Sequence, residues 1–305
     1  MIDERTVQGI ITDIQRFSVH DGQGIRTVIF LKGCPLRCLW CHNPETNRSC
    51  VEMAYYRDKC TGCGQCLRVC PSGAIAEEGA VDQIRCTQCG MCADACCTRA
   101  RVRIGQQKTA GELLNLVQRD NEFYRSTGGM TLSGGEPTMQ PEFALALLRL
   151  AKAAGIHTAI ETCGFCRWED LEPIASACDL FLYDVKHMDS AAHKKSTGVD
   201  NRLIHENLRR LWAIKKQIII RVPLVPGIND TAENLAATAR LAEEVNAREI
   251  HILPFHQLGT EKWHALCRAY AMEETPEPTD EAVQVAREIM RAATKRIVSV
   301  GGHGM

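Results

Sequence analysis

Short apolar runs alternate with longer amphipathic segments over the last two thirds of the chain. The short runs predict buried strands, and the longer segments repeat apolar residues at helical spacing. The predicted helices are Thr109–Asp120, Pro141–Ala154, Trp168–Ala177, Asn201–Ala213, Asp230–Asn246 and Asp280–Ala293. The predicted strands are Met130–Leu132, His157–Glu161, Leu180–Val185, Gln217–Val222 and Glu249–Leu253.

The region before them alternates from Gly9 to Leu31, which suggests one further strand ending at Thr27–Leu31 and brings the count to six. Repeated strand–helix units imply a parallel sheet with helices outside it. We therefore predict an α/β fold in which six units form an open, partial (β/α)6 barrel resembling a TIM barrel. Functional residues of such folds collect at the carboxyl ends of the strands.

A cysteine-rich segment interrupts this pattern between about residues 50 and 104. The run Cys60-x2-Cys63-x2-Cys66-x3-Cys70-Pro71 is followed, 26 residues later, by Cys86-x2-Cys89-x2-Cys92-x3-Cys96. Two copies of one unit form an internal repeat. We predict a core made of residues 1–49 and 105–305, with residues 50–104 as an inserted domain.

Composition narrows the class of protein. The 305 residues include 36 basic and 37 acidic side chains, which gives no sign of a nucleic-acid-binding surface. The 17 cysteines would suit a disulfide scaffold only in a secreted protein, yet Met1–Arg5 is charged and no apolar signal region follows. No apolar stretch reaches the length of a membrane span. These features predict a cytoplasmic protein, not associated with membranes, whose thiols bind metal.

The spacing Cys34-x3-Cys38-x2-Cys41 places three thiolates in one tight loop. A cluster of four irons held by three thiolates keeps one iron free to bind a substrate or cofactor. A zinc site would need a fourth ligand, for which His42 is available, so spacing alone leaves both interpretations open.

Together with Asp21-Gly22-Gln23-Gly24-Ile25-Arg26-Thr27 and Ser133-Gly134-Gly135-Glu136-Pro137, this loop resembles the motifs of radical S-adenosylmethionine (SAM) enzymes. It is most similar to the activating enzymes of glycyl radical enzymes, relatives of pyruvate formate-lyase activase, from about Ile11 to Met272. The resemblance implies a [4Fe-4S] cluster on Cys34, Cys38 and Cys41. It also implies reductive cleavage of SAM to methionine and a 5′-deoxyadenosyl radical, which takes hydrogen from a glycine Cα of a partner glycyl radical enzyme.

The same resemblance implies further site residues. The implied SAM contacts are Trp40, His42, Gly134, Gly135, Glu136, Asp184, Lys186, Arg221 and His256. Glu161, Thr162 and Asp184 resemble a monovalent-cation site, although glutamate replaces the family's aspartate at position 161. Asp21 and Arg26 lie in a turn near the docking place of the partner's glycine loop; a purely structural turn is the alternative.

The cysteine repeat matches the two-cluster pattern of bacterial ferredoxins, in which the fourth cysteine of each run ligates the other cluster. This predicts one [4Fe-4S] cluster on Cys60, Cys63, Cys66 and Cys96, and a second on Cys70, Cys86, Cys89 and Cys92. Cys97 stands where the pattern has proline, so Cys96 and Cys97 both remain candidates. Two zinc ribbons are the alternative, although each ribbon knuckle needs only two cysteines. The remaining cysteines are interpreted as ordinary thiols: Cys50, Cys163, Cys166, Cys178 and Cys267.

The insert is predicted to relay electrons from a ferredoxin or flavodoxin, or to help dock the partner. Pyruvate formate-lyase activase lacks such an insert. The resemblance therefore favours activases of choline trimethylamine-lyase, of glycerol or hydroxyproline dehydratases, or of arylacetate decarboxylases and succinate synthases, with the choline enzyme preferred. Two alternatives remain: a radical SAM enzyme acting on a small molecule, and a plain electron-transfer protein.

Overall fold

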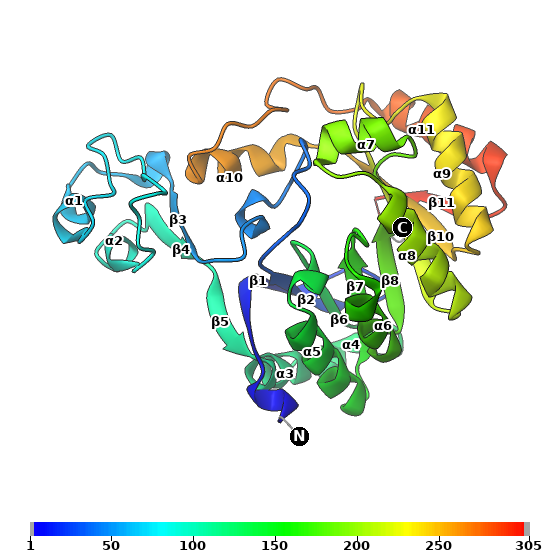
Figure 1. Cartoon of the computed structure of the whole chain (residues 1–305), viewed down its shortest axis with the longest axis horizontal. Coiled ribbons are helices and arrows are strands. Elements are labelled where there is room, and N and C mark those ends of the chain that lie inside the picture. The colour runs from blue at the N-terminus through cyan, green and yellow to red at the C-terminus, as the bar shows by residue number, and fades with distance from the viewer. Residues whose placement is uncertain (1–2, 302–305) are drawn as a thin grey trace.

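A nine-stranded sheet forms the centre of the computed structural model, which describes residues 3–301 (Figure 1). Its order is β11-β10-β9-β8-β7-β6-β2-β1-β5. In this spatial order, the strands from β11 to β2 run parallel to one another. Strands β1 and β5 continue the sheet in antiparallel pairing. The bounds are β1 Gln8–Ser18, β2 Arg26–Leu31, β5 Gln106–Thr109, β6 Gly129–Gly134, β7 His157–Thr162, β8 Leu180–Asp184, β9 Gln217–Leu224, β10 Glu249–Pro254 and β11 Ile297–Val300.

The sheet confirms the predicted parallel arrangement of strands, but one prediction about its first strand was wrong. The segment from Gly9 to Leu31 is not one strand: β1 and β2 pair as an antiparallel hairpin. Gly22 and Gly24, with φ of +121° and +68°, lie in the turn between them. Such angles suit glycine, which has no Cβ to clash with the backbone. β1 alternates over part of its length, whereas β2 is buried at nearly every position, so an alternation pattern alone did not reveal the reversal.

Helices cover the outside of the sheet. The six predicted helices are present as α3, α5, α6, α8, α9 and α11, although several begin or end one or two residues from the predicted bounds. The helix bounds in this part of the chain are α3 Ala110–Gln118, α4 Asn121–Tyr124, α5 Pro141–Ala153, α6 Trp168–Ala177, α7 Ser190–Thr197, α8 Arg202–Ala213, α9 Ala232–Glu244, α10 Thr260–Ala265 and α11 Asp280–Ala293. Their apolar faces bury a continuous core against strand residues such as Ile29, Leu132 and Ile220. The fold is therefore a mixed α/β fold with a parallel sheet, as a partial barrel requires.

The cysteine-rich segment projects to one side of the sheet (Figure 1, left). It lies between two short strands, β3 Glu52–Tyr55 and β4 Arg101–Ile104, which pair antiparallel. Between them, helices α1 Gln65–Val69 and α2 Met91–Asp94 pack against each other. Each of the two helices begins after a glycine in the left-handed region, Gly64 and Gly90. The sequence repeat is therefore also a structural repeat.

No helix within residues 3–301 is long and apolar enough to cross a membrane.

Candidate active site

One cavity of about 420 Å³ opens at the carboxyl ends of strands β2, β6, β7, β8, β9 and β10. It brings together most of the residues that the sequence singled out, although they are spread over more than two hundred positions. The predicted site residues in its wall are Cys34, Cys38, Trp40, Cys41, His42, Gly134, Gly135, Glu161, Thr162, Asp184, Lys186, Arg221 and His256. Glu136, Asp21 and Arg26 are not among the lining residues.

The three-cysteine loop is held by backbone hydrogen bonds on both sides. Gly33 N–H donates to Thr46 O over 2.6 Å, and Arg37 N–H donates to Thr197 O, at the end of α7, over 2.7 Å. Burial raises the pKa of the Cys41 thiol to about 12, and it raises the pKa values of Cys34 and Cys38 as well. Thiols in such surroundings stay protonated near neutral pH until a metal displaces the proton.

The Gly-Gly-Glu loop follows β6 and packs tightly against the cysteine loop. A Cβ atom on Gly135 would lie 2.2 Å from Gly33 O, so the two backbones approach too closely for any side chain there. Glu136 is fully buried, and its carboxylate accepts hydrogen bonds from Cys163 N–H at 2.7 Å and from Thr162 Oγ1 at 2.9 Å. The Glu136 side chain thus fixes the loop from beneath and does not face the cavity.

Charged side chains from strands β7, β8 and β9 meet on another part of the cavity wall. The guanidinium of Arg221 forms an ion pair with Glu161 and lies 3.9 Å from Asp184 and 3.9 Å from Asp21. Lys186 Nζ lies 2.8 Å from Asp184 Oδ2. Burial by itself lowers the pKa of Lys186, but the neighbouring Asp184 carboxylate and the Cys38 sulfur raise it by more. The net pKa lies above the ordinary value for lysine, so the ammonium stays charged. Two cations and two carboxylates therefore share this wall, and the Asp21 carboxylate lies beside Arg221 outside the lining.

The two histidines predicted to lie near SAM are in contact. The rings of His42 and His256 meet edge to face, with centroids 4.4 Å apart. Nδ1 of His256 is buried and has no hydrogen-bond partner, and the same is true of Nε of Arg221. Buried polar atoms without partners are uncommon, and in a cavity wall they indicate room for a ligand that would satisfy them.

Asp21 and Arg26 have different surroundings from those expected of partner contacts. Arg26 is fully buried and donates hydrogen bonds to Thr131 Oγ1 and Met130 O, each over 2.6 Å. Asp21 holds the turn through Ser18 and lies beside Arg221. These contacts favour the structural-turn alternative for Arg26, because its guanidinium presents no surface to a partner.

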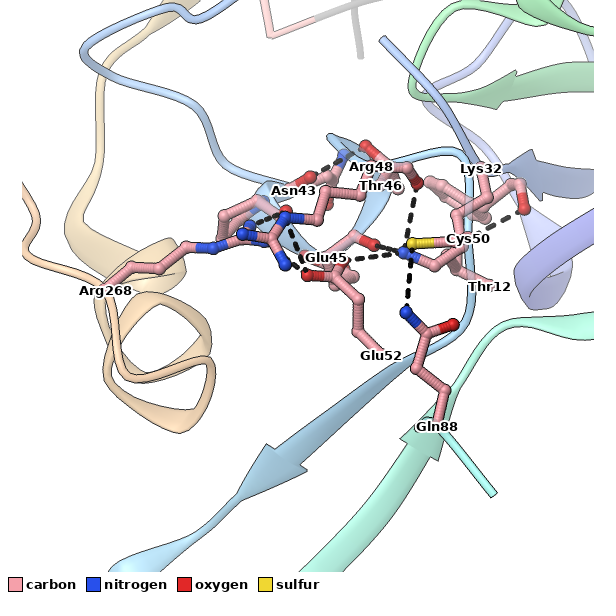
Figure 2. A network of polar contacts seen from close by, with 12 residues as sticks. Thr12, Lys32, Asn43, Glu45, Thr46, Arg48, Cys50, Glu52, Gln88 and Arg268 are labelled. Atoms are coloured by element: carbon pink, nitrogen blue, oxygen red, sulfur yellow. Dashed lines mark hydrogen bonds and ion pairs between the residues drawn. The ribbon is translucent and has the colours of Figure 1, made fainter. Parts of the chain in front are cut away.

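A buried ionic network around Lys32 and Glu52 was not predicted from the sequence (Figure 2). Nζ of Lys32 donates to Glu45 O at 2.7 Å, Arg48 O at 3.2 Å and Glu52 Oε2 at 2.8 Å. Arg268 pairs with the same Glu52 carboxylate and donates to Pro44 O over 2.8 Å. The network joins the end of β2, the segment that follows the cysteine loop, the first residue of β3 and the segment after α10.

In the insert, cysteines of the two runs lie side by side. Cys70 lines one narrow cavity together with Cys86, Cys89 and Cys92. Cys96 lies close enough to Cys60 for charges on the two sulfurs to repel. Cys66 packs against the apolar cluster around Cys92, and Cys63 is exposed.

Backbone N–H groups point at these sulfurs in the same way in both repeats. Gly62 N–H donates to Cys60 over 3.5 Å and Gln88 N–H donates to Cys86 over 3.4 Å. Cys96 is half-buried with its sulfur 3.7 Å from the Thr98 hydroxyl, whereas Cys97 is exposed. Sets of thiols with N–H donors fit iron–sulfur clusters by their donor chemistry. Within residues 3–301, no three Cys, His, Asp or Glu side chains converge as ligands of a single metal ion.

Comparison with known proteins identifies the family of this chain. Residues 28–242 match the sequence profile of the radical SAM superfamily. Isethionate sulfite-lyase activating enzyme of Oleidesulfovibrio alaskensis is 46% identical over 304 residues, covering 95% of this chain and 97% of that protein. Choline trimethylamine-lyase activating enzyme of the same species is 42% identical, covering 90% and 92%. Trans-4-hydroxy-L-proline dehydratase activating enzyme of Clostridioides difficile is 38% identical, covering 93% and 96%.

The fold has a counterpart among solved structures. Streptococcus suis SuiB bound to the precursor peptide SuiA matches with a TM-score of 0.54 at 12% identity, covering 90% of this chain and 48% of SuiB. At that identity the likeness concerns the fold alone. The family profile and the similar proteins show the family: the chain belongs to the radical SAM superfamily and, within it, to the activating enzymes of glycyl radical enzymes.

Proposed function

We propose that the cavity at the strand ends holds a [4Fe-4S] cluster on Cys34, Cys38 and Cys41, with SAM beside it. The observation that carries this proposal is convergence: motifs from six different strand ends supply the wall of one cavity. The family membership removes the plain electron-transfer protein from the alternatives, since the relatives are activating enzymes.

The bound cluster would supply the electron that cleaves SAM into methionine and a 5′-deoxyadenosyl radical. The chain's own residues then have defined tasks. Arg221 and Lys186 place positive charge where the SAM carboxylate would lie, and a guanidinium suits a carboxylate in geometry and charge. Gly134 and Gly135 let backbone approach the ligand, and His256 Nδ1 is free to form a hydrogen bond. We expect the surrounding walls to exclude water during the reaction, which would protect a reactive radical.

A monovalent cation at Glu161, Thr162 and Asp184 has less support. The Glu161 carboxylate is already occupied by Arg221 and by a hydrogen bond from Ser133. Arg221 itself lies where such a cation would neutralise the carboxylates. We therefore expect the guanidinium to supply this charge.

For the insert, we propose two [4Fe-4S] clusters that pass electrons from an external ferredoxin or flavodoxin to the SAM cluster. The support is the placement of Cys70 with Cys86, Cys89 and Cys92, and of Cys96 beside Cys60, as a crossed pattern requires. Replacing Cys63 by Ala should leave SAM binding intact while slowing reduction by the protein donor. Loss of SAM binding in that variant would contradict a relay role.

The partner enzyme is a further proposal. Relatives named for isethionate sulfite-lyase reach 43–46% identity, whereas those named for choline trimethylamine-lyase and 3-sulfopropanediol sulfolyase reach 42%. This supports a partner that cleaves a carbon–sulfur bond of a small sulfonate. The preference for the choline enzyme stays a prediction of the sequence.

The deciding experiment is anaerobic incubation of the reduced protein with SAM and each candidate partner, followed by electron paramagnetic resonance (EPR). A glycyl doublet on one partner is the expected result, and Cys38→Ala should abolish it together with 5′-deoxyadenosine formation. SAM cleavage with a metabolite, without a radical on any partner polypeptide, would instead support the small-molecule alternative. Turnover retained in Cys38→Ala would reject the cluster assignment.

A further inference from the structure

Arg101, the first residue of β4, is a buried cation without a counter-ion. It is only 2% exposed, and no carboxylate lies within 4.0 Å of its guanidinium in residues 3–301. One terminal nitrogen donates to Gly79 O, and the guanidinium carbon lies 4.2 Å from the centroid of the Tyr55 ring. Its Nε and Nη1 atoms have no hydrogen-bond partner. Buried arginines are normally paired, because an unpaired buried charge is costly.

The surroundings of Arg101 indicate what the missing negative charge is. Arg101 follows Cys96 by five residues, and its guanidinium is close enough to favour the thiolates of Cys60 and Cys92. Cys60 and Cys96 belong to one predicted cluster, and Cys92 belongs to the other. Arg101 therefore lies beside both sets of thiols, and its unpartnered Nε and Nη1 atoms have anionic clusters as natural acceptors.

The repeat shows that this arginine is not a requirement of the folding unit. Arg101 follows Cys96 by five residues, and the residue that follows Cys70 by five is Ile75. Ile75 packs in an apolar cluster with Met53 and Cys92. One copy of the unit thus fills this position with a buried apolar side chain, so the second copy has a buried charge without needing it for packing.

We propose that Arg101 is the internal counter-charge of the two insert clusters and raises their reduction potentials. This rests on the proposed cluster content of the insert. Each cluster gains one negative charge when it accepts one electron from the ferredoxin or flavodoxin donor. A buried cation at short range stabilises that reduced state more than the oxidised state, since the interaction scales with charge and is weakly screened inside the protein. Net charge and hydrogen bonds to sulfur are known controls of such potentials.

The test is an EPR-monitored redox titration of the full chain in which Cys34, Cys38 and Cys41 are replaced by Ala, so that only the insert clusters contribute. Arg101→Gln should lower the reduced fraction at a fixed potential by about tenfold for at least one cluster, a shift of ~59 mV to more negative values. Arg101→Lys should stay near the parent. Arg103→Gln is the matched control, because Arg103 lies on the same strand, bonds to the Cys89 carbonyl and is exposed. Unchanged potentials in Arg101→Gln would overturn the proposal.

Iron content separates this outcome from failures elsewhere. A parent chain without iron in the insert would refute the proposed clusters, whereas full iron with unmoved potentials refutes only the role of Arg101. If Arg101→Gln loses iron, the variants Arg101→Lys and Arg101→Met distinguish a charge role of Arg101 from a packing role. Iron retained only by the lysine variant supports the charge role. If both variants retain iron, the reduction potentials of the neutral methionine variant can be measured. Iron kept only by methionine, or lost by both, contradicts the proposal in favour of a packing role.

Discussion

Lys32 Nζ and Glu52 Oε2 lie 2.8 Å apart, and both side chains are almost completely withdrawn from solvent. Lys32 directly follows β2, and Glu52 begins β3. This ion pair therefore links the sheet to the start of the insert. In sequence, the cysteine loop lies between the two residues. Because the ammonium also donates to the carbonyls of Glu45 and Arg48, the position of the segment that follows the cysteine loop depends on the pair.

Replacing Glu52 by Gln should destabilise the protein strongly. It leaves the buried Lys32 without a negative partner, and breaking a buried ion pair costs ~3–5 kcal/mol. Arg48→Gln is the control, since Arg48 is 45% exposed and lies 3.6 Å from the same carboxylate; an exposed contact contributes only ~0–1 kcal/mol. Anaerobic urea unfolding measures both. Equal unfolding midpoints for the two variants would contradict a special role for the buried pair.

This network also shows where prediction from sequence ends. Strands β2 and β6 to β10 and the six longest helices were predicted because each carries its own hydrophobic period, whereas β1, β5, β11 and the shorter helices were not predicted. The motif residues converged as predicted because parallel strands deliver their carboxyl ends to one edge. In contrast, Lys32, Glu52 and Arg268 come from three distant segments, and nothing in their local sequence marks them as buried or paired.

Local sequence also does not reveal which way a motif side chain faces. Glu136 belongs to a ligand-binding motif, yet its carboxylate is buried against Thr162 and Cys163. Arg26 belongs to a turn motif, yet it is fully buried beside Thr131. Both orientations are decided by neighbours from other strands, so they required the three-dimensional structure.

The choice between Cys96 and Cys97 can be tested directly. Cys96 is half-buried, lies near Cys60 and contacts the Thr98 hydroxyl, whereas Cys97 is exposed. Cys96→Ser should therefore remove or convert one insert cluster, and Cys97→Ser should keep the full iron content. Iron and sulfide analysis of the anaerobically reconstituted variants provides the measurement. The opposite pattern would assign Cys97 as the ligand.

Arg221 is expected to make SAM binding independent of the monovalent cation. In the wild-type protein, affinity should be equal in potassium and tetramethylammonium buffers, because the guanidinium already neutralises Glu161 and lies near Asp184. Arg221→Gln should weaken SAM binding by about 10–100-fold through loss of charge-assisted hydrogen bonds. It also leaves Glu161 free to bind a cation, so potassium should partly restore affinity. A potassium requirement in the wild type would show instead a true cation site.

Gly135 tests the close approach of the two loops that form the cavity wall. In Gly135→Ala the new Cβ would lie 2.2 Å from Gly33 O, and because neither a Cβ nor a backbone carbonyl can rotate away, the loops must move apart. A displacement of this size should reduce SAM cleavage by about 100-fold.

Gly227→Ala is the control for this substitution. Gly227 has φ of +72° with no atom within 4 Å of a new Cβ, and it does not line the cavity. Alanine there costs ~1–2 kcal/mol of backbone strain but creates no steric clash. If both variants lost SAM cleavage in proportion to their loss of stability, the loop contact would have no special role. We expect Gly135→Ala to lose cleavage while its insert clusters and its fold remain intact.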